Sequence, residues 1–474
     1  MAASMCRRSK QIGRYVQNAL LCVSRNSSSL QVQLEENTEV EYPPVKPKFP
    51  PGKWGDMDRK YAWHWHDETT KIAEITDPKQ RMDELTSKEM KMWLFKVPEV
   101  YPRQLLFQQY ATKTHMVEGL PDIYTSLETD LLVNKIKELL IEYICLEQDK
   151  ILRNVYLSKF SSWIQSHQRS RIIVDAINRS ILQMTSDGCD HLANCQIGEG
   201  VRVSAFWDRH GIERNRRVMH PTKTTYVTVQ DSRFQAKYVA DFQIRVEQPL
   251  PEFVPVDDPL CSSVDGPNLK YHPTVIGQVQ MRKEKPSVVA GHWLGDPCEF
   301  GQLSMLLTNQ IQQQVDYHQY SKQYELEFEK NLGLSASFVW LVAQAHTQGF
   351  NTYLDLTYPL TTQTILTDGQ HFTFFAYQLN TLHLWKSNDA NPTRNVCWHT
   401  DQMKLYDVVE DGTVKGFNDD VLRNIVKMFV LKPRAREVNL RPTLPAGDSR
   451  LIEQTKYLSE KQEEIVEEVE ETYV

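Results

Sequence analysis

The amino-acid sequence predicts an α+β fold, in which a mixed or antiparallel sheet with a central hairpin is covered by helices. The hairpin spans Thr361 to Leu384, where Asp368 and Gly369 separate two runs rich in β-branched and aromatic residues. Asp-Gly tolerates positive φ and favours a type I′ turn. Both faces of the second run are largely apolar, so we expect the sheet to be covered on both sides.

Three further helices are predicted from apolar residues that recur at spacings of three and four. The first two cover Ser126 to Leu152 and Leu157 to Met184, and we expect them to form a helical hairpin. The third follows Asn418, a favourable N-cap residue, and its apolar stripe includes Leu422. We expect this third helix to pack on the hairpin sheet.

The middle of the chain changes its pattern several times. Residues Val201 to Val246 alternate between apolar and polar, which predicts strands joined by a loop. We then expect a strand from Pro273 to Met281 and a polar helix from Gln302 to Lys330. Gly333 leads into an apolar helix that ends at Gly349.

Composition divides the chain into four parts. Residues 1–34 contain five basic residues and no acid, which is typical of a mitochondrial transit peptide; a disordered basic arm is the alternative. Residues 35–100 are expected to form an extended or helical N-terminal arm, because five prolines lie between 43 and 51. Residues 101–445 form the predicted globular α+β body. Residues 446–474 form an acidic tail that is helical or disordered.

Composition also excludes several classes of protein. No window approaches the length of uninterrupted apolar sequence that a membrane span needs. The eight cysteines are scattered, unlike those of a secreted disulfide scaffold. A net charge of −7 argues against a uniformly basic nucleic-acid coat, so any RNA contact has to be a local patch.

Basic residues gather at two places that fit such a patch. One is the loop predicted between the strands of the 201–246 segment, and a smaller one follows the last predicted helix. Guanidinium groups pair with phosphate oxygens in a bidentate manner, which favours contact with an RNA backbone. A solvated charged loop is the alternative. The candidate rRNA-contacting residues are Arg209, Arg214, Arg216, Arg217, Lys223, Arg434 and Arg436.

Motifs of catalysis are missing from the sequence. We find no Gly-rich phosphate loop, no HExxH, no CxxC and no Gly-x-Ser-x-Gly elbow. A chain of this length contains an acid–base set by chance, so the histidines and aspartates near the hairpin do not indicate an enzyme. We therefore predict neither an enzyme nor a cofactor. That set is His346, His371, His383, Asp355 and Asp368.

Two short clusters have the residue types of a metal site but not the spacing. Cys189, His191 and Cys195 lack a fourth ligand at a suitable position. His64 and His66 are two residues apart without a nearby cysteine or third histidine, which favours aromatic packing. We predict no metal site.

Several runs of the sequence resemble a mitochondrial ribosomal protein family. They are TDGQHFTFFAYQLNTL (Thr367 to Leu382), NPTRNVCW (Asn391 to Trp398) and KGFNDDVLRNIVKMF (Lys415 to Phe429). The family is large-subunit protein sixty-five, formerly called small-subunit protein thirty and also programmed cell death protein nine. Weaker likeness covers FQQYATKTHMVEGLP (Phe107 to Pro121) and DPCEFG (Asp296 to Gly301). These runs are fold signatures rather than catalytic motifs.

The resemblance implies a structural constituent of the mitochondrial large ribosomal subunit, located on the mitochondrial ribosome in the matrix and without a cofactor. It implies as partners the large-subunit rRNA and other mitochondrial ribosomal proteins, including the related large-subunit protein thirty-seven. It also favours the phosphate-binding interpretation of the arginine loop. The alternatives are a non-ribosomal mitochondrial interaction protein linked to apoptosis and a cryptic enzyme.

Overall fold

The computed structural model of the protein describes the central part of the chain, and these residues belong to one compact unit, Lys53–Val474. The predicted transit peptide, the proline-containing segment and the acidic tail lie outside the described residues. The described residues are 75, 78–85, 91–98, 100–153, 162–186, 188–219, 224–262, 272–282, 284, 286–292, 296–352, 354–410, 412–438 and 440.

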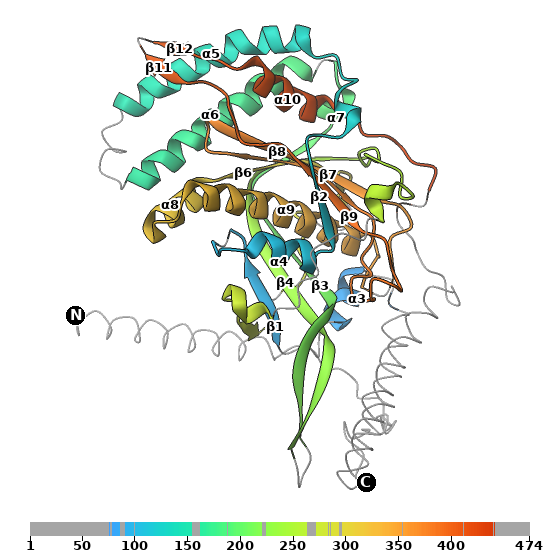
Figure 1. Ribbon diagram of the computed structural model, residues 1–474. Coiled ribbons are helices and arrows are strands. Elements are labelled where there is room, and N and C mark those ends of the chain that lie inside the picture. Colours follow the sequence, from blue (N-terminus) through green and yellow to red (C-terminus); the bar gives the residue numbers. More distant parts are fainter. Residues whose placement is uncertain are drawn as a thin grey trace, which may run out of the picture. The chain divides into compact units, whose positions relative to one another are not determined.

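A mixed sheet forms the centre of this unit (Figure 1). Its strands are β1 (Lys91–Lys96), β2 (Thr114–Glu118), β3 (Gln196–Met219), β4 (Thr224–Val246), β5 (Gln280–Arg282), β6 (Phe300–Leu307), β7 (Leu360–Thr367), β8 (His371–Leu379), β9 (Asn395–His399) and β10 (Met403–Lys404). Their order is β2-β9-β8-β7-β6-β4-β1-β5, while β10 pairs with β8 and β3 pairs with β4. The pairs β2–β9, β6–β7 and β1–β4 are parallel, so the sheet is mixed, as the sequence predicted.

Helices surround the sheet, and a small separate hairpin is formed by β11 (Val408–Glu410) and β12 (Thr413–Lys415). The helices are α3 (Pro78–Leu85), α4 (Gln104–Ala111), α5 (Asp130–Arg153), α6 (Ser162–Thr185), α7 (Asp190–Ala193), α8 (Asn309–His318), α9 (Lys322–Thr347) and α10 (Asp419–Val430). Short 3-10 helices cover Asp122–Tyr124, Pro259–Cys261 and Pro273–Ile276. The predicted pair of long helices is confirmed as α5 and α6. No helix of the described part is long and apolar enough to cross a membrane.

The predicted central hairpin is confirmed as β7 and β8, but its turn differs from the prediction. Positive φ falls on Gly369 (φ 90°) and not on Asp368. A type I′ turn needs positive φ at both central residues, whereas type II′ needs it only at the first, which is commonly glycine. The pairing of Thr367 with Phe372 makes Gly369 the first residue of the two-residue loop. Asp368 precedes this loop, and its carboxylate accepts hydrogen bonds from the backbone N–H groups beyond it.

Adjacent residues of β7 show that the hairpin is covered on both faces. Gln363 donates its side-chain amide to the carbonyl oxygen of Met428 in α10, at 2.9 Å. The next residue, Thr364, shares a hydrogen bond of 2.8 Å with Ser337 of α9. Because successive strand residues point to opposite faces, α10 and α9 lie on opposite sides of the sheet. Figure 1 shows α5, α6 and α10 on one side and α8 and α9 on the other, so the predicted packing of the last helix on the sheet is confirmed.

Three predictions for the middle of the chain are wrong. The polar helix expected from Gln302 to Lys330 begins instead as strand β6, every residue of which is buried. A short apolar run does not distinguish a buried strand from a helix by its periodicity, which explains the error. Helix α9 begins at Lys322 and continues through Gly333, whereas the prediction began a helix after Gly333. The strand expected from Pro273 is a 3-10 turn, and β5 begins only at Gln280.

The folded body begins earlier than the expected boundary at residue 100. Strand β1 pairs in parallel with β4 and antiparallel with β5, so it is an internal strand of the sheet. Trp93 and Phe95 of β1 are buried in the main core. The part of the expected arm that the structure describes therefore includes a strand of the body.

Candidate nucleic-acid interface

The predicted arginines between 209 and 217 lie on strand β3, so the loop prediction is wrong. Beyond the rest of the sheet, β3 and β4 continue as a two-stranded ribbon, which we define as residues 210–219 and 224–231 (Figure 1). The neighbours β1 and β6 pair with β4 only from Phe234 onward. Within the ribbon the pairing places Arg214 opposite Val229, Arg216 opposite Val227 and Arg217 opposite Tyr226. Lys223 lies outside the described residues.

Arg209 has a structural position at the base of the ribbon. Its side chain is 4% exposed, and its guanidinium lies 4.4 Å from the centre of the Tyr110 ring. Nε donates to the carbonyl oxygen of Tyr110 at 2.8 Å, and Nη1 donates to that of Leu384 at 3.2 Å. Burial lowers the pKa of Arg209 from its ordinary value. Because this guanidinium is buried against backbone carbonyls, we no longer count Arg209 among the candidate rRNA contacts.

Contacts of Tyr110 and Leu384 with His210 fix the point at which the ribbon extends beyond the body. Tyr110 donates its hydroxyl to the carbonyl oxygen of His210 at 2.8 Å, and His210 N–H donates to Leu384 at 3.0 Å. The strand register shifts between His210 and Arg214, which marks a β-bulge. Gly211 within it has φ 91°, and a Cβ there would lie 2.4 Å from the Tyr110 hydroxyl oxygen. The bulge therefore requires glycine and brings α4 into direct contact with the ribbon.

A buried ion pair joins the two strands immediately before the ribbon. Arg233 of β4 binds both carboxylate oxygens of Asp208 of β3 at 2.6 Å, and each side chain is 8% exposed. The guanidinium also lies 5.3 Å from the centre of the Phe206 ring. His346 of α9 also contacts Phe206, at 4.9 Å between ring centres, and burial lowers the pKa of His346 to about 3. This ion pair carries no net charge and Arg209 is buried, so an exposed positive patch has to come from the ribbon beyond the base.

The second predicted basic cluster divides into one exposed and one structural arginine. Arg434 is exposed, although its backbone N–H donates to Pro249 at 2.9 Å. Arg436 donates to the carbonyl oxygens of Pro359 and Leu250, and its guanidinium lies 5.5 Å from the centre of the Tyr358 ring. Burial lowers the pKa of Arg436. We therefore keep Arg434 as a candidate rRNA contact and assign Arg436 to the packing of the chain.

The histidines and aspartates considered for acid–base chemistry do not form one site. His371 pairs with Asp368 at 2.9 Å at the hairpin turn. His383 lies 3.4 Å from Asp355, whose carboxylate also accepts the N–H of Leu382. His346 is buried at the base of the ribbon. His371 begins β8 and His383 follows its end, so the two pairs lie at opposite ends of that strand.

The cysteine and histidine cluster around α7 is also used for packing. His191 contacts the carbonyl oxygen of Phe429 through Nε2 at 3.1 Å, and Cys195 donates its thiol to Leu192 at 3.1 Å. Cys189 is buried. Within the described ranges, no group of three metal-ligating side chains is close enough to hold an ion. His64 and His66 lie outside these ranges.

One unusual side chain escaped the sequence analysis. Lys113 is 2% exposed and its ammonium donates to the carbonyl oxygen of Asn391. Burial, with a smaller contribution from Arg209 and Arg394, lowers the pKa of Lys113 to about 7. A lysine next to a polar run carries no sequence signal of burial, so only the structure identifies it. It connects the start of β2 to the segment before β9.

Residues 8–433 match the family model described as mitochondrial 28S ribosomal protein S30 (PDCD9). The match includes the ribbon, the central hairpin and α10. It ends before Arg434, so the second basic cluster lies outside it.

Proposed function

The chain belongs to the family of mitochondrial 28S ribosomal protein S30 (PDCD9), and from that premise we propose that it is a structural constituent of the large subunit of the mitochondrial ribosome. The family match over residues 8–433 carries the ribosomal part of this proposal. The protein is thus mitochondrial, and the matrix, where mitochondrial translation takes place, is its proposed location. The printed name of the family refers to the 28S subunit, so the experiment below distinguishes the two subunits.

The proposed role is support and contact rather than catalysis. The family is one of ribosomal structural proteins. The polar groups near the hairpin are bonded to turns and backbone, as His371 is to Asp368. The proposed partners are other mitochondrial ribosomal proteins, including large-subunit protein thirty-seven, and the large-subunit rRNA.

We propose that the ribbon carries the contact with rRNA. The sequence from Glu213 to Asp231, which includes most of both ribbon strands and the residues between them, holds four cations against two acids, whereas the whole chain has a net charge of −7. A protein that repels RNA overall needs its cations concentrated in one place. A ribbon that pairs with no other described strand can reach a groove or a phosphate row without moving the body. The four cations are Arg214, Arg216, Arg217 and Lys223.

Sedimentation of a mitochondrial extract on a magnesium-containing gradient tests the proposal. The full chain should migrate with the large-subunit rRNA and leave that fraction when removal of magnesium unfolds the particle. Migration with the small-subunit rRNA would overturn the subunit assignment. Recovery at the top of the gradient, as free protein, would overturn the ribosomal role itself.

A further inference from the structure

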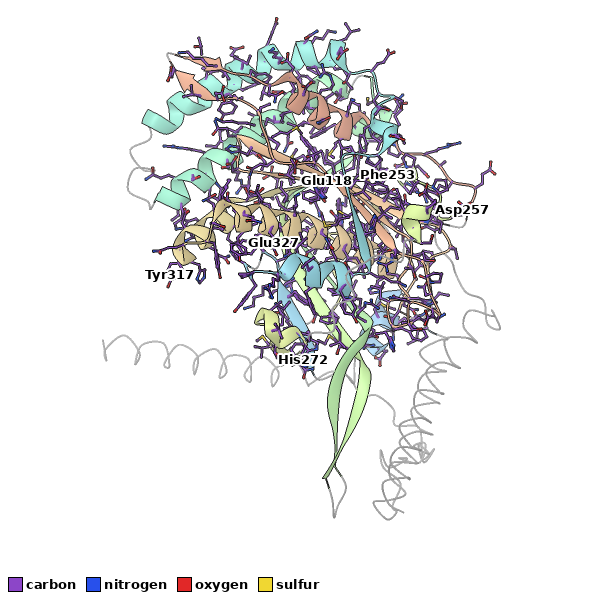
Figure 2. The ribbon with its side chains drawn as sticks, in the orientation of Figure 1. Glu118, Phe253, Asp257, His272, Tyr317 and Glu327 are labelled. Carbon is purple, nitrogen blue, oxygen red and sulfur yellow. The ribbon has the colours of Figure 1, made fainter. Side chains whose placement is uncertain are left out.

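The corner between α8 and α9 carries a run of aromatic side chains that leads from solvent into the core. Tyr317 is 81% exposed, and Tyr324 is 38% exposed, while Phe328 is 1% exposed. Figure 2 shows Tyr317 at the free end of α8, away from the strands. A single exposed tyrosine is ordinary on a protein surface, but a connected series of rings is not. We call this series, Tyr317, His318, Tyr320, Tyr324 and Phe328, the aromatic corner.

Ring contacts connect every member of the aromatic corner. Tyr317 meets His318 edge-on at 5.0 Å between ring centres, and His318 lies 5.5 Å from Tyr320. Tyr320 and Tyr324 are 5.7 Å apart, and both contact Phe328, at 5.5 and 6.1 Å. These spacings are those of favourable aromatic pairs. Tyr320 and Tyr324 therefore pack directly on the buried ring of Phe328, and Tyr317 is connected to them through His318.

A break between the two helices presents the rings at one corner. Gln319 adopts the left-handed conformation, with φ 56°, and its N–H donates to the end of α8. Tyr320 N–H donates to the carbonyl oxygen of Val315 at 3.0 Å, which closes the turn. The rings of Tyr317 and Tyr320 thus flank a tight turn rather than following one helix. Such rigid, amphipathic rings bind a partner at low entropic cost.

The charges around the aromatic corner oppose a phosphate and favour a cation. From residue 309 to 324 only Asp316 and Lys322 carry full charges. Lys322 pairs with Glu325 at 2.8 Å, so its charge is already compensated. Asp316 is exposed, accepts a hydrogen bond from Gln312, and is in no ion pair with the other described residues. RNA needs cations for its phosphates, whereas here the exposed carboxylate of Asp316 is next in sequence to the exposed ring of Tyr317, whose π face attracts cations.

We propose that the aromatic corner docks an arginine-bearing, extended segment of a partner protein. The guanidinium of such a segment stacks on Tyr317 and pairs with the carboxylate of Asp316. Tyrosine and arginine are the residues that most often dominate protein interfaces, and planar guanidinium stacks on aromatic rings. The amide side chains along α8, including Gln312 and Gln313, supply hydrogen bonds to an extended backbone. This inference does not depend on the particle to which the protein belongs.

Titration of the full chain with a labelled arginine–proline–glycine peptide tests the proposal, with binding followed by fluorescence anisotropy. Tyr317→Ala should weaken binding by about tenfold, the loss of a moderate interface residue. Tyr317→Phe keeps the ring and should retain binding, and Asp316→Asn should lower both affinity and its dependence on salt. Since Tyr317 and Asp316 are exposed, these variants should unfold at the wild-type temperature.

Two comparisons make the test specific. Tyr143→Ala removes a 37% exposed tyrosine from α5, far from the corner in sequence, and should leave peptide binding unchanged. A peptide with glutamate in place of arginine should not bind. Equal loss in Tyr143→Ala and Tyr317→Ala would overturn the proposal, because it would indicate nonspecific attraction to an acidic protein. The proposal would also be overturned if Tyr317→Ala weakened the binding of oligouridylate but left the binding of the arginine peptide unchanged.

Discussion

Gly333 of α9 lies against the ring of Phe375 in β8 so closely that a Cβ on Gly333 would come within 2.4 Å of the ring carbons. Glycine here is not required by the backbone, since the residue is in the middle of a helix. It is required by the distance between the helix and the strand. The central helix and the central hairpin therefore touch at a point where no side chain fits.

The contact predicts that Gly333→Ala destabilises the protein. Alanine gains about 1 kcal/mol of helix propensity over glycine, but overpacking of a core costs about 1 to 3 kcal/mol. The ring of Phe375 is fully buried and has little room to move, so the overpacking cost outweighs the gain in propensity, and we expect a net loss of up to about 2 kcal/mol in the free energy of unfolding. Denaturant unfolding measures it. In a Phe375→Leu background the same substitution should cost clearly less, and equal costs in both backgrounds would refute the contact.

The buried pair of Asp208 and Arg233 predicts a large effect of removing one partner. Arg233→Met leaves a carboxylate buried without its cation, which costs about 3 to 5 kcal/mol of stability. Lys415→Met is the matched control, because Lys415 and Glu410 form an equally short pair whose side chains are 56% and 54% exposed. That exposed pair should contribute about 1 kcal/mol or less. Similar losses in the two variants, measured by denaturant unfolding, would contradict the burial of the first pair.

Glu329 predicts a dependence of stability on pH. Burial, followed by the like charge of Glu325, raises the pKa of Glu329 to about 7, and Gln402 donates to both of its oxygens at 3.1 Å. The raised pKa means that the folded state favours the protonated carboxyl. The stability that the protonated carboxyl of Glu329 contributes is therefore complete below the pKa that Glu329 has in the unfolded chain. It is lost as pH rises through about 7.

Glu329→Gln removes the ionisation and keeps an acceptor for Gln402. The variant should exceed the wild type in unfolding free energy by roughly 2 to 3 kcal/mol at alkaline pH, and the difference should vanish in mild acid. Unfolding curves collected across this range give the comparison. A constant difference at every pH would show that Glu329 does not titrate in the way its burial implies.

Packing of α10 on the sheet predicts unequal effects of two leucine truncations. Leu422 of α10 is fully buried, whereas Leu131 of α5 is 82% exposed. Leu422→Ala should cost about 2 to 5 kcal/mol, the range for removing a buried leucine. Leu131→Ala should leave the unfolding midpoint almost unchanged. If both variants unfold with the wild type, α10 does not form part of the core.

The sequence predicted the elements that are determined by residues close together in the chain. The hairpin followed from alternating residues around Asp368 and Gly369, and α10 followed from its N-cap Asn418, whose side chain accepts the N–H of Asp420 at 3.0 Å. The prediction missed strand β6 because its residues are buried on both faces. Gln302 was therefore assigned to a polar helix. Its amide instead donates to the carbonyl oxygen of Phe429 at 2.7 Å, a partner more than a hundred residues away.

The sequence predicted which segment holds the basic residues of the candidate site, but not which of their side chains are buried. The density of arginines identified the ribbon segment, yet charge alone does not separate a surface cation from a buried one. Arg209 is buried because Tyr110 and Leu384, distant in sequence, supply its acceptors. The aromatic corner escaped notice because Tyr317 and Tyr324 stand in a polar run, and their connection to Phe328 depends on the turn at Gln319.

Incorporation of a ribbon variant into the ribosome tests the central claim most directly. Replacing Arg214, Arg216 and Arg217 with Ala should leave the body folded, because the ribbon pairs with no other described strand. Each lost phosphate contact reduces the slope of log affinity against log salt by about one unit. The matched control replaces three exposed cations of α5 and α6, Lys135, Arg169 and Arg179.

The measurement is the fraction of each variant that co-sediments with the large subunit as salt is raised. We predict that the ribbon variant is depleted from that fraction, with a flatter salt dependence, while the control variant matches the wild type. Normal incorporation of the ribbon variant with an unchanged salt slope would contradict the account, because protein neighbours alone would then hold the chain in place.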